Sequence, residues 1–341
     1  MAEQSNIQTL INSWNHELAS TEEESKDFCL RQCKIAETML NTEPLKADGI
    51  AAALIHFAQH NIGDHDSKLE IEKEALLVRG ATLYRLTQYQ EALTISSRAL
   101  EIAKEIGDIK GQSFAMNTMG AVAIAQGDYE SALHQHTESL ALRKSIHDDA
   151  LMATSLMNIG NVYLALGDLT NALEYFMQSL LLREKINDEH GIGVSLSNIG
   201  NVYGIMGDAD QAVVYLQKSL ASKIATNNKQ GQVQTLCDLA TQYLSLGDVT
   251  KARDHANVAL QVAIYLGNID GEASALHLLG LIETDATEYK YALEYFTHSL
   301  TLRTKSGNTR GYVETVLAQC DVFIYLQQYK EALATLDEIQ K

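Results

Sequence analysis

A repeat of forty residues runs through most of the chain and constrains its fold more than any other feature. Small residues recur at this interval in the series Gly80, Gly120, Gly160, Gly200, Ala240, Gly280 and Cys320. Alanine follows twelve residues later in every unit, at Ala92, Ala132, Ala172, Ala212, Ala252, Ala292 and Ala332. Because the register continues without insertion or deletion from position 80 to position 332, each period is expected to form one structural unit stacked on the next.

Each unit has the pattern of two helices separated by a short turn. Apolar residues at helical spacing, such as Leu156 and Tyr163, precede the pair Gly167-Asp168. Glycine tolerates the left-handed conformation that ends a helix, and aspartate can cap the next helix by accepting hydrogen bonds from its free backbone amides. Residues 170–186 then predict the second helix of that unit.

Small and aromatic residues recur at fixed places within the units. Gly160 and Ala172 would let neighbouring helices approach closely, and Tyr163 and Phe176 would fill the space beside them. The only proline of the 341 residues is Pro44, whereas strand-rich folds use proline and glycine freely at their many turns. The sequence therefore predicts an all-α fold.

At these residues the chain resembles the tetratricopeptide repeat family in a form with forty residues per repeat. The marks are Gly160, Tyr163, Leu166-Gly167-Asp168, Ala172, Phe176 and Ser179-Leu180. The resemblance implies a right-handed superhelical solenoid of antiparallel helix pairs, with six full repeats and a truncated seventh over residues 71–341. The turn glycine is replaced at Thr87, Thr287 and Gln327, which is expected to weaken individual turns.

The first 70 residues lack the repeat. Residues 8–19, 22–41 and 46–61 have helical patterns, with a break at residues 42–44. Because a solenoid needs an end that covers its last apolar face, we expect residues 1–70 to form an N-terminal helical cap or a degenerate repeat. Trp14 is then a core residue rather than a platform for a ligand.

The charge balance excludes several classes of partner. The chain has 26 basic and 44 acidic residues, a net charge of −18, without a basic cluster that could neutralise phosphates. This argues against nucleic acids and anionic membrane surfaces as partners. No apolar run is long enough to cross a bilayer, and no secretory signal is visible at the start. Four scattered cysteines suit a reducing cytoplasm, which is the expected localisation.

Motifs for catalysis, cofactors and metals are weak or lacking. The sequence has no nucleophile elbow, phosphate-binding loop or kinase signature, so neither an enzyme nor a cofactor is expected. His56 and His60 lie one helical turn apart and are followed by Asp64, His65 and Asp66, which together offer nitrogen and oxygen donors. Histidines four residues apart are common by accident, so the sequence predicts no metal site, although metal binding at His56, His60 and His65 stays open.

Asparagine side chains recur in the first helices of consecutive repeats. They are Asn117, Asn158, Asn161, Asn198 and Asn201. A buried amide without a partner is costly, so these side chains should face a groove or bind another group. Similarity to kinesin light chains, to adaptors with Leu-Gly-Asn repeats and to bacterial peptide-pheromone receptors implies that they hold the backbone of an extended peptide. Alternatively, some of them bond only to the adjacent repeat.

Basic residues recur late in the second helices. Arg143, Arg183, Lys223 and Arg303 stand in register. They would form either a basic stripe for an acidic partner, with Arg143 and Arg183 as ligand-binding residues, or simply cations that favour the negative end of the helix dipole. Acidic residues lie in the first helices of the last repeats, at Glu283, Asp285 and Asp321. A ligand that reaches them is expected to be basic or neutral there.

These patterns indicate a non-catalytic peptide- or protein-binding module. Its style resembles the sensory or regulatory parts of bacterial nucleotide cyclases, diguanylate cyclases and histidine kinases. The last helical pattern, residues 330–341, stops before the leucine that earlier repeats have, so we expect further repeats or an output domain after Lys341. The alternative is a stand-alone scaffold or adaptor that self-associates through its open C-terminal repeat.

Overall fold

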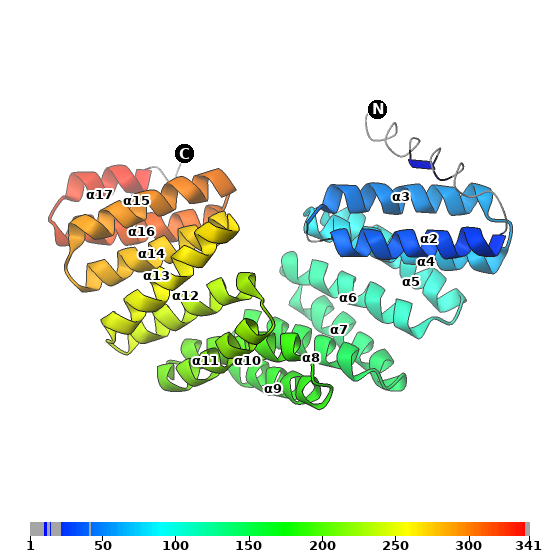
Figure 1. Cartoon of the computed structure of the whole chain (residues 1–341), viewed down its shortest axis with the longest axis horizontal. Helices are drawn as coiled ribbons and strands as arrows, with labels where there is room; N and C mark the ends of the chain where they lie inside the picture. The colour runs from blue at the N-terminus through cyan, green and yellow to red at the C-terminus, as the bar shows by residue number, and fades with distance from the viewer. Residues whose placement is uncertain (1–9, 12–13, 15–21, 41, 338–341) are drawn as a thin grey trace. The chain divides into compact units, whose positions relative to one another are not determined.

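The computed structural model describes the chain except for residues 1–9, 12–13, 15–21, 41 and 338–341 (Figure 1). Sixteen helices and no strand occur in the described residues. The chain divides into two compact units, Met1–Leu182 and Arg183–Lys341, and the division falls within α9 (Leu169–Lys185). No described helix combines the length and the apolar character that crossing a membrane requires.

Two helices with described bounds, α2 (Glu22–Met39) and α3 (Pro44–Asn61), precede the repeats in the first unit. The helices that follow them before α9 are α4 (His65–Arg85), α5 (Tyr89–Glu105), α6 (Ile109–Ala125), α7 (Tyr129–Ser145) and α8 (Asp149–Ala165). Successive helices pack against one another as antiparallel pairs (Figure 1). The expected boundary between residues 70 and 71 lies inside α4, because the first helix of the first repeat begins at His65.

The second unit continues the same alternation of helices. It contains α10 (Glu189–Ile205), α11 (Ala209–Ala225), α12 (Lys229–Ser245), α13 (Val249–Leu266), α14 (Ile269–Asp285), α15 (Tyr289–Ser306), α16 (Thr309–Tyr325) and α17 (Tyr329–Asp337). The predicted all-α fold of consecutive helix pairs is confirmed in the described parts of both units. Of the last expected helix, residues 338–341 lie outside the described residues.

The turn between the two helices of a repeat forms as the sequence predicts. Gly167 has a φ of 76°, and the Asp168 side chain accepts a hydrogen bond of 3.1 Å from the backbone amide of Asn171. Where glycine is replaced, the turn keeps its left-handed conformation. Thr87 and Thr287 have φ values of 59° and 61°, which puts a β-branched residue in a conformation that favours glycine.

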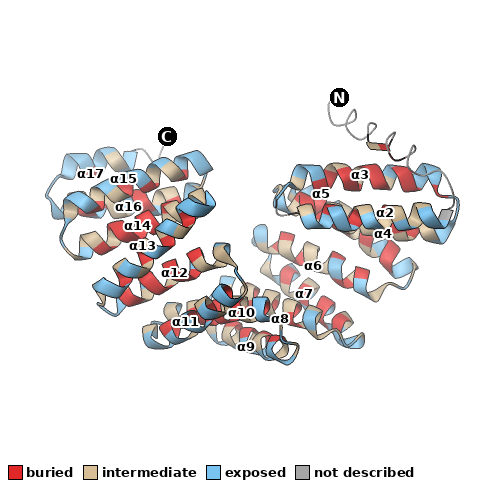
Figure 2. Cartoon of the chain, viewed as in Figure 1, coloured by how far each residue is buried: buried red, intermediate tan, exposed pale blue. Residues whose placement is uncertain are grey.

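Buried side chains lie between paired helices, as the red stripes of Figure 2 show within each unit. The predicted contact between the small and the aromatic positions is present. A Cβ added to Gly160 would lie 2.7 Å from the ring of Phe176, and one added to Gly280 would meet Phe296 in the same way. The missing Cβ therefore lets the two helices of a repeat pack closely around a buried aromatic ring.

The N-terminal helices have a core of their own against α4. Trp14 is only 5% exposed, and its ring makes edge-on contacts with Phe28 and Phe57, at centroid distances of 6.0 and 6.3 Å. This core also includes Ile71 of α4. Trp14 is thus a core residue, as predicted. Most of the helix expected over residues 8–19 lies outside the described residues, and the role of residues 1–70 as a cap stays a prediction.

The first helices of the repeats pack against each other within each unit. Helix α6 contacts α4 and α8 in the first unit, and α12 contacts α10 and α14 in the second. The second helices do not contact each other to a comparable extent in the described residues. We call the side that the first helices form within each unit the first-helix surface of that unit. It consists of α4, α6 and α8 in the first unit and, separately, of α10, α12, α14 and α16 in the second.

Candidate functional site

Two of the predicted asparagines bond to each other. Asn158 of α8 donates a hydrogen bond of 2.6 Å from its Nδ2 to Oδ1 of Asn117 on α6. Both side chains are half-buried. The bond joins the first helices of neighbouring repeats, which is the alternative that the sequence left open for some of these residues. One donor and one acceptor of this pair are therefore already used within the chain.

Asn161 and Asn198 have amides that are not engaged in this way. Asn161 follows Asn158 by one turn of α8, and Asn198 holds the position of α10 that corresponds to Asn158, forty residues along. Both residues are half-buried, and neither side chain forms a hydrogen bond within the described part of the chain. Each amide thus retains two donor hydrogens and an acceptor oxygen.

Asn201 lies beside a carboxylate that sequence reasoning did not single out as a site. Its amide is close enough to Asp238 of α12 to favour the charged form of that carboxyl group. Gln234 donates a hydrogen bond of 2.9 Å from Nε2 to Oδ1 of Asp238. Burial nevertheless raises the pKa of Asp238 above its ordinary value. The hydrogen bond from Gln234, the charge of Lys223 and the nearby Asn201 amide act in the opposite direction. The sequence could have indicated this position, because Asp238 follows Asn198 by one forty-residue repeat.

Arg143 is fully buried and is used for packing. Its Nε donates to Ser113 Oγ of α6 at 3.2 Å, and its Nη1 donates to the Leu151 carbonyl and to Ser155 Oγ of α8, at 2.8 and 2.9 Å. Burial lowers the pKa of Arg143 to about 10. The guanidinium group bonds to neighbouring helices rather than to the carboxyl end of its own helix, and it has no exposed surface to offer a partner.

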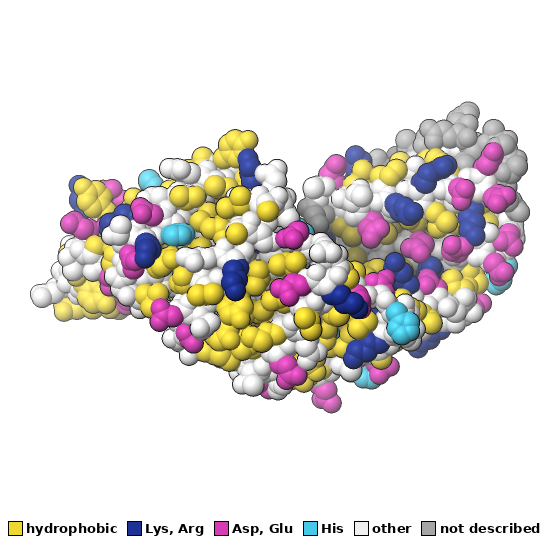
Figure 3. Space-filling model, turned by 60° about the horizontal axis from the view of Figure 1, so that its bottom comes forward, with side chains coloured by type: hydrophobic (Ala, Val, Ile, Leu, Met, Phe, Trp, Pro, Cys, Tyr) yellow, Lys and Arg dark blue, Asp and Glu magenta, His cyan; other side chains and the backbone are white. Residues whose placement is uncertain are grey.

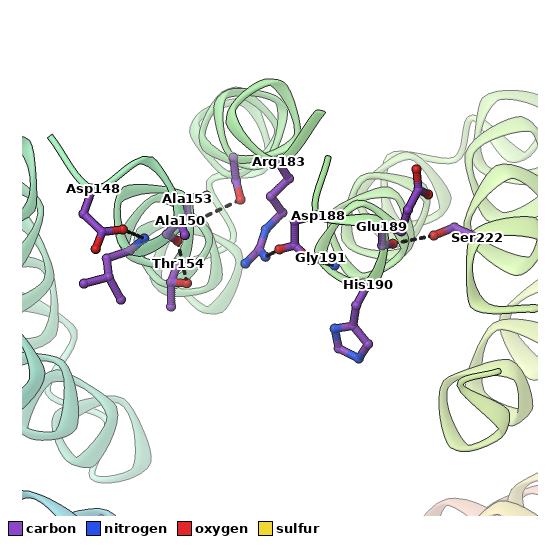
Figure 4. Close-up of polar contacts among 12 residues, drawn as sticks. Asp148, Ala150, Ala153, Thr154, Arg183, Asp188, Glu189, His190, Gly191 and Ser222 are labelled. Atoms are coloured by element: carbon purple, nitrogen blue, oxygen red, sulfur yellow. Dashed lines mark hydrogen bonds and ion pairs between the residues drawn. The ribbon is translucent and has the colours of Figure 1, made fainter. Parts of the chain in front are cut away.

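The other basic residues in this register make similar contacts. Figure 4 shows the guanidinium group of Arg183 directed at Asp188, to which its Nη1 donates at 2.5 Å. Lys223 donates to the hydroxyl groups of Ser197 and Thr235, at 2.9 and 2.7 Å. Arg303 donates to the Gly311 carbonyl. Arg143 and Lys223 thus connect a second helix to the first helices on both sides of it, and Arg183 and Arg303 bond to residues at the start of the helix that follows.

The register therefore does not form an exposed basic stripe. Arg183 is 8% exposed and Arg143 is 0% exposed. On the face that Figure 3 shows, Lys and Arg are scattered among acidic and hydrophobic side chains. We leave Arg143 and Arg183 out of the proposed ligand-binding site for this reason.

The acidic residues expected in the last repeats differ in their surroundings. Glu283 of α14 is neutralised by Arg253 of α13, whose Nε and Nη2 donate to its two oxygens at 2.9 and 3.1 Å. Asp285 and Asp321 are exposed. Glu283 is consequently engaged within the chain and offers little charge to a ligand.

Two of the three histidines considered for metal binding, His56 and His60, stack on the exposed side of α3, and no contact joins His65 to them in the described residues. The rings of His56 and His60 stack with centroids 4.2 Å apart, and His60 Nδ1 lies 2.8 Å from the His56 carbonyl oxygen. His65 Nε2 lies 3.9 Å from Glu105 on α5. No group of three or more histidine, cysteine or carboxylate side chains among the described residues has a geometry that could hold a metal ion.

The repeat is recognised by comparison with known families. The sequence model of the tetratricopeptide repeat matches residues 74–145 and 151–225. This confirms the family resemblance on these residues, and the same turns and helix pairs continue through α12 to α17. No curated protein sequence matches the chain.

Solved structures with the same fold include a quorum sensor and a gene regulator in complex with a peptide. The apo form of the quorum sensor NprR from B. thuringiensis has a TM-score of 0.75 at 15% identity, covering 96% of this chain and 90% of that one. A Rap conjugation gene regulator of plasmid pLS20, in complex with the Phr* peptide, has a TM-score of 0.62 at 14% identity, covering 98% and 96%. A Rap protein complexed with Competence and Sporulation Factor has a TM-score of 0.66 at 12% identity, covering 92% and 97%. At these identities the likeness shows the shared fold.

Proposed function

We propose that this chain of tetratricopeptide repeats is a non-catalytic binding module whose first-helix surface holds an extended peptide segment. The observations that carry the proposal are two side chains, each within its own unit: Asn161 in the first unit and Asn198 in the second. Each is half-buried on a first helix and keeps its amide without a hydrogen bond in the described part of the chain. A partly desolvated amide is a group that gains from a partner.

The chemistry of an amide suits a peptide backbone. A primary amide donates and accepts at once, so it can pair with the carbonyl and the N–H of an extended segment, whose backbone groups have no partners of their own. Partial burial reduces the competition from water. Such hydrogen bonds bind the peptide backbone and do not depend on one particular side chain. Neighbouring contacts would then select the peptide sequence.

The similarity to solved structures is a second line of support for this proposal. One regulator of the same fold was solved in complex with the Phr* peptide, and another is named a quorum sensor. By analogy, we propose a sensory or regulatory role for this chain within a larger signalling protein, in the cytoplasm and without a cofactor. The four cysteines, which are all free and buried, agree with a reducing compartment.

Substitution of the two free amides tests the proposal. Short peptides that bind the chain are first selected from a randomised display library, and their affinities are then measured for Asn161→Ala and Asn198→Ala. Loss of one partly buried hydrogen-bonding amide is expected to weaken binding about tenfold. Circular dichroism should show unchanged helix content.

Asn257 provides the matched control. It is also half-buried, but it lies on the second helix α13, so Asn257→Ala should leave the affinity unchanged. Equal affinities for wild type, Asn161→Ala and Asn198→Ala would contradict the proposed role of these amides.

A second candidate is self-association through the last repeat. Leu333 and Tyr329 of α17 are 63% and 61% exposed. Large exposed apolar side chains favour contact with another copy. Oligomers that increase with protein concentration in light scattering, and that Leu333→Glu abolishes, are the expected result. Particles of monomer mass at all concentrations would exclude it.

A further inference from the structure

We propose that Asp238 is a ligand-binding carboxylate of the second unit, covered by Gln234 in the free chain, and that it receives a protonated amine or guanidinium group of the bound peptide. The inference rests on the proposed function and adds to it the charge of the ligand at this position. It assigns a binding role to a residue whose surroundings otherwise leave one oxygen without a partner.

The unpartnered oxygen is the first observation. Oδ2 of Asp238 is buried from solvent and has no hydrogen bond of ordinary geometry among the described residues, although the Asn201 amide lies near the carboxylate, whereas Oδ1 accepts from Gln234. Leaving a carboxylate oxygen buried and unbonded is unfavourable, and the penalty disappears when a donor reaches it. Asp238 is therefore poised to gain from an added donor.

The surrounding charges favour a cationic donor. Lys223 is the nearby basic group, but its Nζ donates to the hydroxyl groups of Ser197 and Thr235, and it forms no ion pair with Asp238 in the described residues. Its charge offsets that of Asp238 only in part, because burial still dominates and disfavours the ionised carboxyl group. A cation placed against Oδ2 would supply both the missing bond and a charge in a poorly solvated setting.

Gln234 is placed to act as a movable cover. It lies one helical turn before Asp238 on α12 and is itself exposed, so its side chain can leave Oδ1 for water. A single hydrogen bond between an exposed and a partly buried group contributes little net stability. Displacement of Gln234 by a cationic group would open the carboxylate without changes in the helix.

The position of Asp238 agrees with that of the proposed backbone clamp. Asp238 stands in the same place on α12 as Asn198 on α10, and these two helices are in contact on the first-helix surface. Asn201, one turn after Asn198, lies against the Asp238 carboxylate. A peptide segment whose backbone is held by Asn198 would therefore have a side chain or its amino terminus within reach of Asp238.

Defined peptide pools test the inference. Three pools of fluorescent short peptides are randomised alike, except that each member contains one fixed Lys or Arg, one fixed norleucine or one fixed Glu. Wild-type chain is expected to bind the Lys and Arg pool about tenfold more tightly than the norleucine pool, and the Glu pool more weakly than either. Fluorescence polarisation measures all three affinities.

Two variants should change this preference in opposite directions. Asp238→Asn should abolish it while retaining the fold, because Asn already occupies the equivalent positions 158 and 198. Gln234→Ala should enlarge it by removing the competing donor, and its exposed position leaves the fold intact. Asp254→Asn, an exposed residue on α13, changes the net charge equally and should keep the wild-type preference.

The possible failures are distinguishable. If wild type binds the pools without regard to charge, or if Asp254→Asn abolishes the preference as Asp238→Asn does, the role of Asp238 is overturned while peptide binding stands. If Gln234→Ala weakens binding of the Lys and Arg pool, the cover is overturned. If no pool binds wild type, the proposed function fails and the inference fails with it.

Discussion

His136→Phe is expected to make the chain more stable and to remove much of its sensitivity to acid. His136 of α7 is 0% exposed, and neither ring nitrogen has a hydrogen-bond partner in the described residues. It takes the place that Phe176 and Phe296 hold in later repeats, against Gly120. A phenyl ring therefore fits the site, and it contains no nitrogen that requires a partner.

The sign of the pH dependence follows from the burial of the imidazole. Burial, assisted by the nearby Arg143 charge, lowers the pKa of His136 from 6.5 to about 4. The fold thus favours the neutral ring, and the unfolded chain binds a proton more readily. Stability is retained above pH 6.5 and is lost as the pH falls from there towards 4. The loss from this one residue is about 3 kcal/mol.

Urea unfolding at neutral pH and near pH 4.5 measures this effect. The difference in unfolding free energy between the two pH values should shrink by about 2 to 3 kcal/mol in His136→Phe. Some sensitivity will remain, because burial also lowers the pKa of His277 to about 4. His134→Gln, at an exposed position on the same helix, should behave like wild type. An unchanged pH dependence in His136→Phe would contradict the burial of a neutral imidazole.

Arg143→Ala is expected to destabilise the first unit by about 3 kcal/mol. The substitution removes three hydrogen bonds that connect α7 with α6 and α8, and it leaves the Leu151 carbonyl and the Ser155 hydroxyl short of a donor. It also empties the volume of the largest fully buried side chain. Both effects add to the cost of the lost bonds.

The Arg143→Lys variant tests whether the hydrogen bonds of Arg143 stabilise the fold or whether its buried charge is only tolerated. Lys223 already serves the same register through two hydroxyl groups, so the lysine variant should lose only about 1 kcal/mol. The free energy of unfolding in urea is the measurement for both variants. Because Nη2 of Arg143 has no partner in the described residues, a stable Arg143→Ala would mean that desolvation of the cation outweighs its hydrogen bonds.

The helices, turns and aromatic contacts could be predicted because they depend on short-range chemistry. The expected second helix at residues 170–186 is observed as α9, Leu169–Lys185. The predicted cap at Asp168 and the contact between Gly160 and Phe176 are likewise confirmed. Each of these features depends on the backbone conformation or the side-chain volume of a particular residue, so the residue type is enough to predict it.

The pairing of polar side chains could not be predicted from the sequence alone. Whether Asn158 faces a ligand or Asn117 depends on side-chain rotamers and on the distance between the two helices that carry these residues, which are 41 positions apart in sequence. Arg143 has the pattern of an exposed cation at a helix end, yet the next repeat packs over it. Because basic residues recur at one position of the repeat, the sequence could have indicated that they make a similar contact in each repeat.

The most direct test observes the asparagine amides themselves. Chain labelled with ¹⁵N at asparagine is titrated with the tightest peptide from the display library, and the side-chain amide signals are assigned with the Asn161→Ala, Asn198→Ala and Asn257→Ala variants. The largest shifts are expected at Asn161 or Asn198, with Asn257 unmoved. Shifts confined to Asn257 and other residues of the second helices would contradict binding at the first-helix surface.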